Sequence, residues 1–215
     1  MIDIIKKIKD ENPFYEKGVV KNIFSWQELE TLINLRPFVN NKRFKFISKD
    51  YHRWNNQAWL SDNNSWPATK LEEVINKHVC YFSDCSRVNE KINNICKTIE
   101  TELNLPTDAH IYFSMNEEDK SEGFKSHWDY SHNLIAQVEG SSIFKVWSDK
   151  HTEGGQSQQP TTDPIMEVTM KPGDLIFIPK NTLHEATSLS KRLSISFPMT
   201  EHLDLPPQDR NWIKL

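Results

Sequence analysis

The chain has 215 residues, of which 37% are hydrophobic and 11% are aromatic. This composition predicts a folded globular protein and excludes a disordered or low-complexity chain. The formal net charge of -4 argues against a general binder of nucleic acid or of an anionic membrane surface.

The sequence favours a reducing compartment. It holds no apolar run long enough to cross a membrane, and charged residues among the first seven positions argue against a signal peptide. The cysteines Cys80, Cys85 and Cys96 form neither an even disulfide framework nor a CxxC pair. We therefore expect reduced thiols in a cytoplasmic protein.

The first hundred residues predict mostly helices. Ser25 and Glu28 have the spacing of a capping box ahead of an apolar run, and Pro67 can open a second helix. A third helix is predicted over 86–103, where apolar residues follow helical spacing. We expect these helices to serve as a scaffold.

From residue 110 onwards the pattern changes to short strands rich in β-branched and aromatic residues, separated by turn signals. Such spacing predicts a mostly β protein with N-terminal helices, built on a double-sheet jelly roll. We expect one domain over 1–215, with a helical scaffold at 1–107, the jelly-roll core at 108–199 and a C-terminal tail at 200–215. The predicted strands are 110–115, 125–130, 133–138, 143–147, 165–170, 175–178 and 193–197.

His127, Asp129 and His184 are the candidate metal ligands. In an extended strand side chains alternate, so His127 and Asp129 would share one face. Pro179 would end the preceding strand, and Asn181 can adopt the left-handed conformation that turns His184 inward. Two imidazoles and one carboxylate on one face of a metal leave positions open, as suits Fe(II) and O₂.

These motifs resemble the cupin-type JmjC oxygenases, in particular the ribosomal-oxygenase branch. The resemblance covers about residues 108–199 and implies a double-stranded β-helix barrel that uses Fe(II), O₂ and 2-oxoglutarate to hydroxylate a C–H bond. It is carried by the runs His110-Ile-Tyr-Phe-Ser, His127-Trp-Asp, Asn133-Leu-Ile-Ala-Gln-Val-Glu-Gly and Lys171-Pro-Gly-Asp-Leu-Ile-Phe-Ile-Pro-Lys-Asn-Thr-Leu-His-Glu.

The resemblance also implies roles for further residues. His127, Asp129 and His184 would hold the iron, Asn133 would line the 2-oxoglutarate pocket, and Tyr112 and Ser114 would hydrogen-bond the same cosubstrate. All of these residues are present at the matching positions.

The chain departs from the family pattern at Ser142, where the family usually has a lysine or arginine for the far carboxylate of 2-oxoglutarate. A buried carboxylate needs a cation or several donors, so the charge must be met elsewhere or the cosubstrate differs. Arg192 is the first candidate, because it shares strand parity with Ser194 and Ser196, and Lys125 is the second.

Alternatives stay open at this point. The resemblance favours a protein side chain as substrate, with a small molecule as competitor. From the net charge and the lack of a membrane-spanning run we expect no nucleic-acid or membrane partner. Ser142 also leaves room for a metal-dependent cupin enzyme, a dioxygenase or isomerase, that does not use 2-oxoglutarate. A non-catalytic ligand-binding barrel is the third interpretation, although structural metals tend to have closed coordination.

Overall fold

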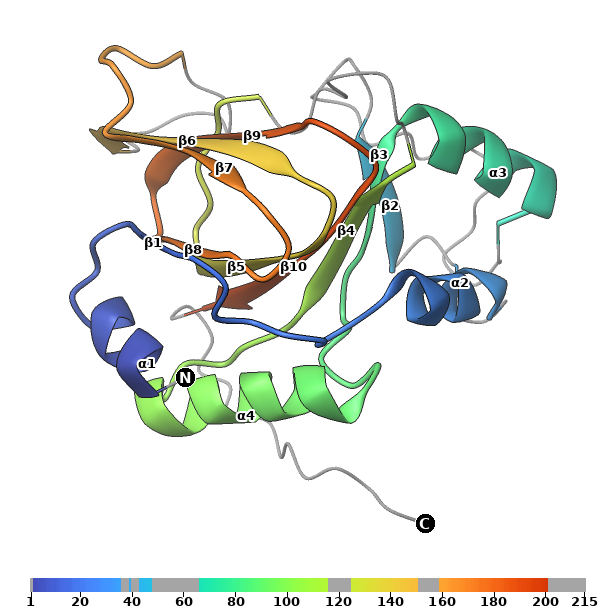
Figure 1. The fold of residues 1–215 in the computed structure, drawn as a ribbon, viewed down its shortest axis with the longest axis horizontal. Helices are drawn as coiled ribbons and strands as arrows, with labels where there is room; N and C mark the ends of the chain where they lie inside the picture. Colours follow the sequence, from blue (N-terminus) through green and yellow to red (C-terminus); the bar gives the residue numbers. More distant parts are fainter. Residues whose placement is uncertain are drawn as a thin grey trace.

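The computed structural model describes residues 2–35, 39, 43–47, 66–115, 125–150 and 159–200. Two antiparallel sheets face each other as a barrel, with helices outside it (Figure 1). The larger sheet has the order β1-β8-β5-β10-β4-β3-β2, and the smaller has the order β7-β6-β9. The strands are β1 Phe14–Glu16, β2 Phe44–Ile47, β3 Val79–Phe82, β4 His110–Ser114, β5 His132–Glu139, β6 Ser142–Lys150, β7 Met166–Met170, β8 Leu175–Ile178, β9 Thr182–Ser188 and β10 Arg192–Met199.

The described helices begin at the residues their caps predict. In α2 (Trp26–Asn34) the backbone N–H of Glu28 donates to the Ser25 hydroxyl. Pro67 precedes α3 (Ala68–Lys77), and α4 (Glu90–Leu103) begins after Asn89 rather than at 86, because the Asn89 side chain caps it. A short helix, α1 (Ile2–Ile8), precedes these three.

Three predictions of secondary structure were wrong. The first hundred residues also contribute strands β1, β2 and β3, since the larger sheet recruits short apolar segments by edge pairing. Segment 125–130 is not a strand and pairs only through a bridge of His127 with His184. Conversely, His184 lies within a strand, β9, which the sequence analysis treated as a turn. Of the expected tail at 200–215, residues 201–215 lie outside the described part of the chain.

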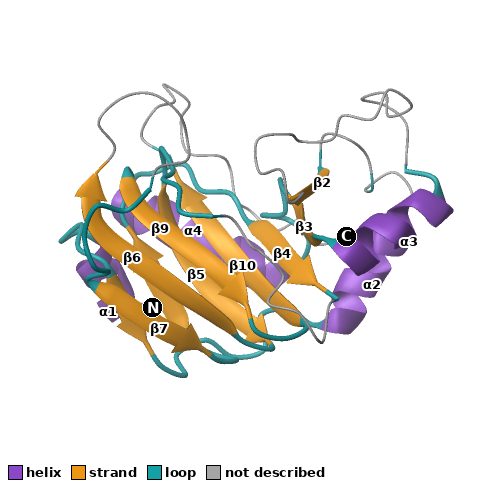
Figure 2. Ribbon diagram, turned by 90° about the horizontal axis from the view of Figure 1, so that it is seen from above, coloured by secondary structure: helices purple, strands orange, loops and turns teal. Residues whose placement is uncertain are grey.

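The larger sheet is buried on both faces. Along β10, Leu193, Ile195 and Phe197 belong to the apolar core that α1, α2 and α4 cover, while Arg192, Ser194 and Ser196 face a cavity inside the barrel. Strand alternation alone produces this division. Figure 2 shows α4 behind the sheet and α2 and α3 beyond its β2–β4 edge.

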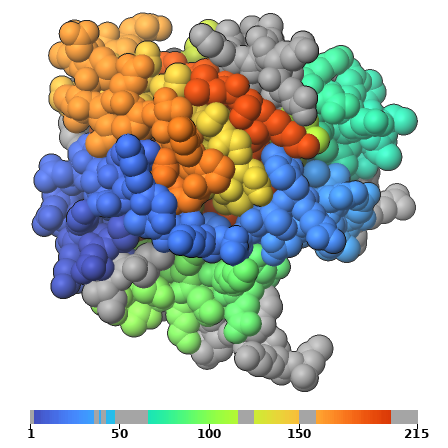
Figure 3. Space-filling view, viewed as in Figure 1, coloured from blue at the N-terminus to red at the C-terminus, as the bar shows by residue number. Residues whose placement is uncertain are grey.

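The N-terminal segment crosses the molecule between the barrel strands and α4, as the blue atoms of Figure 3 show. Asp174 holds it in place by accepting hydrogen bonds from the Gly18 N–H, at 3.0 Å, and from the Tyr15 hydroxyl, at 2.5 Å. Burial and this carboxylate raise the pKa of Tyr15 to about 12. Tyr15 therefore stays protonated and can donate at neutral pH.

Gly140 joins β5 to β6 and sets the position of the chain around Arg192. Its φ is +66°, and a Cβ there would lie 2.0 Å from the Lys191 carbonyl oxygen and 2.9 Å from the Arg192 Cα. Gly18 has a similar φ of +64° but nothing within 4 Å of a Cβ. Alanine substitutions at the two glycines can therefore separate the cost of backbone strain from the cost of steric overlap.

We expect Gly140→Ala to lower the free energy of unfolding by about 3–5 kcal/mol, because left-handed strain and overpacking add. Gly18→Ala should cost only about 1–2 kcal/mol, from strain alone. Urea denaturation of both variants measures the difference, and equal losses would contradict the close approach of Gly140 to Arg192.

Candidate metal centre and pocket

His127, Asp129 and His184 come together at one end of the barrel cavity. Their ligand atoms all lie within 4.8 Å of one another, and both histidines are buried. The His127 and His184 rings have centroids 4.2 Å apart, and His184 Nε2 lies 3.6 Å from Asp129 Oδ2. The sequence prediction that these three residues share a site matches this geometry, although 125–130 is not a strand.

A backbone bridge brings the two histidines together. The His127 N–H donates to the His184 carbonyl at 2.9 Å, and the His184 N–H donates to the His127 carbonyl at 2.8 Å. Residues directly opposite one another in antiparallel pairing project their side chains to the same side. The bridge therefore places both imidazoles toward the cavity.

Hydrogen bonds also fix which ring nitrogen can bind a metal. His127 Nδ1 lies 2.8 Å from the Lys125 carbonyl oxygen, and His184 Nδ1 lies 2.9 Å from the Thr182 carbonyl oxygen. A carbonyl only accepts, so each Nδ1 must donate its proton. Both Nε2 lone pairs are thus left for a metal, in the manner of supported metal ligands.

Asp129 is oriented from the opposite side. The Asn133 side-chain amide donates to Asp129 Oδ2 at 2.7 Å, and the Ser196 hydroxyl donates to Asn133 Oδ1 at 3.1 Å. The Asn181 backbone N–H donates to the Asp129 carbonyl at 2.7 Å, from the left-handed conformation expected of Asn181 (φ 58°). Asn133 therefore supports the carboxylate as well as lining the pocket.

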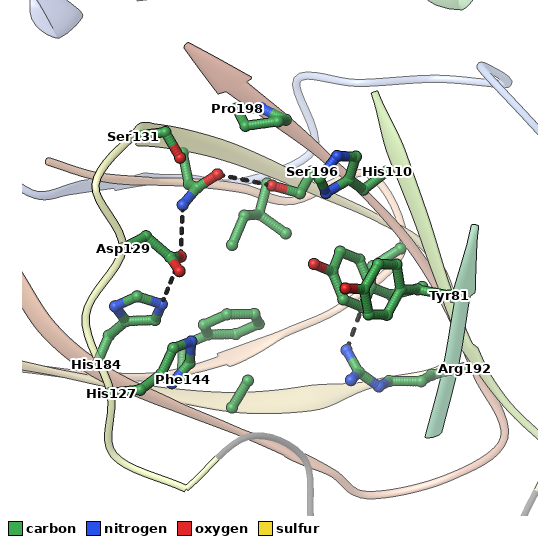
Figure 4. A pocket seen from close by; sticks show the side chains of 15 residues that line it. Tyr81, His110, His127, Asp129, Ser131, Phe144, His184, Arg192, Ser196 and Pro198 are labelled. Atoms are coloured by element: carbon green, nitrogen blue, oxygen red, sulfur yellow. Dashed lines mark hydrogen bonds and ion pairs between the residues drawn. The ribbon is translucent and has the colours of Figure 1, made fainter. Parts of the chain in front are cut away.

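Arg192 lies across the cavity from the metal ligands (Figure 4). The cavity has a volume of about 230 Å³, and its lining includes Tyr112 and Arg192 but neither Ser114 nor Lys125. Ser114 pairs with Arg192 across the β4–β10 ladder, and Lys125 is exposed, with only its carbonyl engaged at the site. The structure thus brings Arg192, and not Lys125, to the pocket.

Arg192 is buried without an acidic partner in the described part of the chain. Its side chain is only 3% exposed, and Nη1 donates to the Ser194 hydroxyl at 3.3 Å. Its Nε–H is buried and makes no hydrogen bond to any described residue, and the same holds for the buried Ser188 hydroxyl. Burial lowers the pKa of Arg192 to about 10, so the group stays cationic at neutral pH.

Ser142 closes the same end of the barrel without a charge. It is fully buried, lies opposite Ser188 in the β6–β9 ladder, and donates from its hydroxyl to Gln137 Oε1 at 2.6 Å. Arg192 is therefore the cation available at this end among the lining residues.

Sequence reasoning missed two residues of the pocket wall, Tyr81 and His110. Tyr81 lies on β3, directly opposite Tyr112, and its ring stacks on that of His110 with centroids 5.9 Å apart. His110 was quoted only as part of a motif, and the region around Tyr81 was assigned to helices. An apolar run of four residues, Val79–Phe82, was the signal for a buried strand there.

His132 and Glu185 flank the candidate ligands without joining them. His132 accepts a hydrogen bond from the Lys180 N–H at 3.3 Å and stacks on Phe177. Glu185 lies opposite Lys145 on the outer side of the β6–β9 ladder. Neither belongs to the group of three possible ligands.

Removal of the metal should reveal a pH dependence set by His127. Burial, helped by the neighbouring His184, lowers the pKa of His127 to about 4 from 6.5. Between these values the unfolded chain binds a proton that the folded chain does not. The contribution of neutral His127 to the free energy of unfolding is therefore fully present above pH 6.5. It is lost as the pH falls toward 4, at about 1.4 kcal/mol per pH unit.

We expect the free energy of unfolding, measured by urea denaturation in EDTA, to fall with this slope between pH 6.5 and 4.5. His127→Gln, which has no titrating group, should show a correspondingly shallower slope. An identical pH dependence in both proteins would contradict the buried, neutral state of His127.

Comparison with known proteins agrees with this geometry. The JmjC domain family matches residues 83–204. The bifunctional lysine-specific demethylase and histidyl-hydroxylase NO66 of Dictyostelium discoideum is 24% identical over 204 residues, which are 87% of this chain and 37% of that protein. The NO66 of Drosophila persimilis is 28% identical over 101 residues, which are 45% of this chain and 14% of that protein. The chain spans well under half the length of these relatives.

Solved structures show the same fold. Escherichia coli YcfD superimposes with a TM-score of 0.67 at 16% identity, covering 94% of this chain and 53% of that one. YcfD described as a ribosomal oxygenase in complex with cobalt and 2-oxoglutarate gives a TM-score of 0.62 at 18% identity, covering 90% and 49%. Among the described helices of this chain, none has the length and apolar character needed to cross a membrane. With more than half of its length matched by the family, the chain belongs to the JmjC domain family.

Proposed function

We propose that this protein is an Fe(II)- and 2-oxoglutarate-dependent oxygenase that hydroxylates a C–H bond of a protein side chain. One observation carries the proposal: a three-ligand metal group and a buried arginine without an anionic partner lie at opposite ends of one cavity. A dicarboxylate that chelates the metal at one end and meets the arginine at the other would satisfy both.

The donor set fits iron. Two Nε2 atoms and one carboxylate from the same side of the cavity leave open positions, which suits Fe(II) better than a closed structural site. When bound, Fe(II) with 2-oxoglutarate and O₂ supplies the oxidation of a C–H bond to an alcohol, with succinate and CO₂ as the other products. The chain itself holds the ligands and orients them.

The opposite end of the cavity suits the far carboxylate of 2-oxoglutarate. Arg192 offers a buried cation whose Nε–H has no hydrogen-bond partner among the described residues. Between the two ends the wall is apolar, from Ile135, Phe144 and Ala186, which matches the two methylene groups of the cosubstrate. These contacts support Arg192 as the anchor in place of a cation at position 142.

We also propose a protein as substrate and the cytoplasm as location. The NO66 relatives are named as a lysine demethylase and a histidyl hydroxylase, and YcfD as a ribosomal oxygenase, which supports a polypeptide over a small molecule. The three cysteines are buried and form no disulfide within the described residues, which supports a reducing compartment.

His127→Ala and Asp129→Ala should each reduce Fe(II)-dependent formation of succinate from 2-oxoglutarate by well over 100-fold, because a metal ligand is lost. Substitution of a residue that only hydrogen-bonds to a metal ligand lowers metal affinity or activity by about 10–100-fold. His132→Asn is the matched control, since the amide oxygen can replace the acceptor for Lys180 N–H without touching the metal. Retained turnover in either ligand variant would contradict the assignment.

Arg192→Met should weaken 2-oxoglutarate binding to the Zn(II)-loaded protein by about 30–1,000-fold, because a buried carboxylate would lose its cation. Lys125→Met, on an exposed residue outside the pocket, should leave the affinity unchanged. Isothermal titration calorimetry measures both. An unaltered affinity for Arg192→Met would contradict Arg192 as the anchor and move the far carboxylate to another residue. No measurable binding of 2-oxoglutarate to the Zn(II)-loaded wild-type protein would instead favour a cupin enzyme that does not use 2-oxoglutarate.

A further inference from the structure

We infer that a groove between α2 and α3 is a docking site for an amphipathic α-helix of another protein, one that carries lysine or arginine on both sides of its apolar stripe. This α2–α3 groove is lined by one face of each helix and by a floor of buried apolar residues. The inference concerns a second surface of the molecule and does not depend on the proposed function.

The α2–α3 groove is separate from the metal site. Its volume is about 830 Å³, against about 230 Å³ for the barrel cavity, and the two share no lining residue. Figure 2 shows α2 and α3 together beyond the β2–β4 edge of the larger sheet, outside the barrel. A ligand bound between these helices therefore leaves the barrel cavity open.

The two walls of the groove have the spacing that accepts a third helix. The lining positions are 26, 29, 30 and 33 on α2 and 68, 71, 72 and 75 on α3. Steps of three and four residues place the side chains of each set on one face of a helix. Two such faces with a gap between them can take up a helix that carries its own apolar stripe at the same spacing.

The floor of the groove is already formed. The backbone N–H of Trp66 donates to the Val39 carbonyl at 3.1 Å, and both residues are buried. The Trp66 ring packs edge-on against Phe44 and Phe46, with centroids 5.2 and 5.7 Å apart. Because these contacts exist before a partner arrives, docking needs little ordering of the floor.

The walls above this floor leave apolar surface exposed. Trp26 and Ile33 on α2 and Ile75 on α3 pack on the core but are only partly buried. Leu35, which follows the lining residue Asn34 at the end of α2, is 49% exposed. Contiguous apolar surface of this kind is typical of a site that binds another protein.

The charges on the groove specify the partner. Glu30 on α2 and Glu72 on α3 supply one exposed carboxylate to each wall, and neither forms an ion pair with a described residue. Lys191 is the cation among the lining residues, and its ammonium group lies over the Trp26 ring, 4.6 Å from the centroid. Two acidic walls favour a helix with basic flanks and disfavour an anionic membrane surface.

Most of the groove lies outside the part of the chain that defines the family. The JmjC domain family matches residues 83–204, and the lining residues other than Met115 and Lys191 come before that region. The docking surface is therefore built by the N-terminal helices and not by the barrel motif.

The first test uses two blocked 15-residue peptides as probes. One has leucine at every third or fourth position, lysine on both sides of this stripe and alanine elsewhere, and the other has glutamate in place of every lysine. Fluorescence anisotropy with the full chain should show binding of the lysine peptide at least about 10-fold tighter than that of the glutamate peptide. No binding of either peptide, or equal binding of both, would overturn the inference.

A charge reversal separates docking in the groove from attraction to the whole molecule. In Glu30→Lys/Glu72→Lys the preference should change to the glutamate peptide. Asp10→Lys/Glu102→Lys is the matched control, because it makes the same change of net charge at exposed residues outside the groove and should keep the preference for lysine. The same loss of preference in both double variants would show non-specific attraction and contradict the site.

Cross-linking locates the bound peptide. With benzoylphenylalanine in place of its central leucine, the lysine peptide should attach under light to residues 26–34 and 68–77, as mass spectrometry of the digested protein measures. Attachment only elsewhere would refute the groove as the site. Sedimentation of the full chain tests a second copy as occupant: a dimer that Ile75→Asn dissociates would assign the groove to self-association and overturn a separate helical partner.

Discussion

The metal site depends on one pair of backbone hydrogen bonds, those between His127 and His184. They join two segments 57 positions apart and replace the continuous strand that a regular ladder would need. Because the pair is isolated, the chain on either side of His127 is free to turn, which allows Asp129 to approach the same point. The carbonyls of Lys125 and Thr182 then fix both ring tautomers. Backbone groups therefore set the geometry of both imidazoles, while the Asn133 side chain orients the Asp129 carboxylate.

The second constraint is a sheet buried on both faces with opposite chemistry on each. Strand β10 places Leu193, Ile195 and Phe197 against the helices and Arg192 and two serines in the cavity. Buried polar groups are costly unless they are paired, so most of the inner face is tied into hydrogen bonds, such as Ser196 to Asn133. Arg192 Nε, on a residue that lines the cavity, is an exception, since it has no hydrogen-bond partner within the described part of the chain.

The cavity thus divides by chemistry into a metal end, an apolar middle and a cationic end. A neutral Ser142, hydrogen-bonded to Gln137, and a cation at Arg192 keep a single positive charge near the floor of the barrel. Two buried cations there would repel each other at low dielectric. Under the proposed function, Arg192 on β10 would supply from the facing sheet the charge that Ser142 does not carry.

The sequence by itself predicted the barrel type, which the fold confirms, and it named His127, Asp129 and His184 as candidate ligands and Arg192 ahead of Lys125. Strand alternation, turn residues and ligand chemistry are local properties, and a short motif records them. Only the tertiary structure decided that 125–130 forms a bridge, that β1, β2 and β3 join the sheet, and that Tyr81 and His110 line the pocket. It also excluded Lys125 and Ser114 from the lining. These outcomes depend on which distant strands pair and in which register, and no local pattern encodes a partner far along the chain.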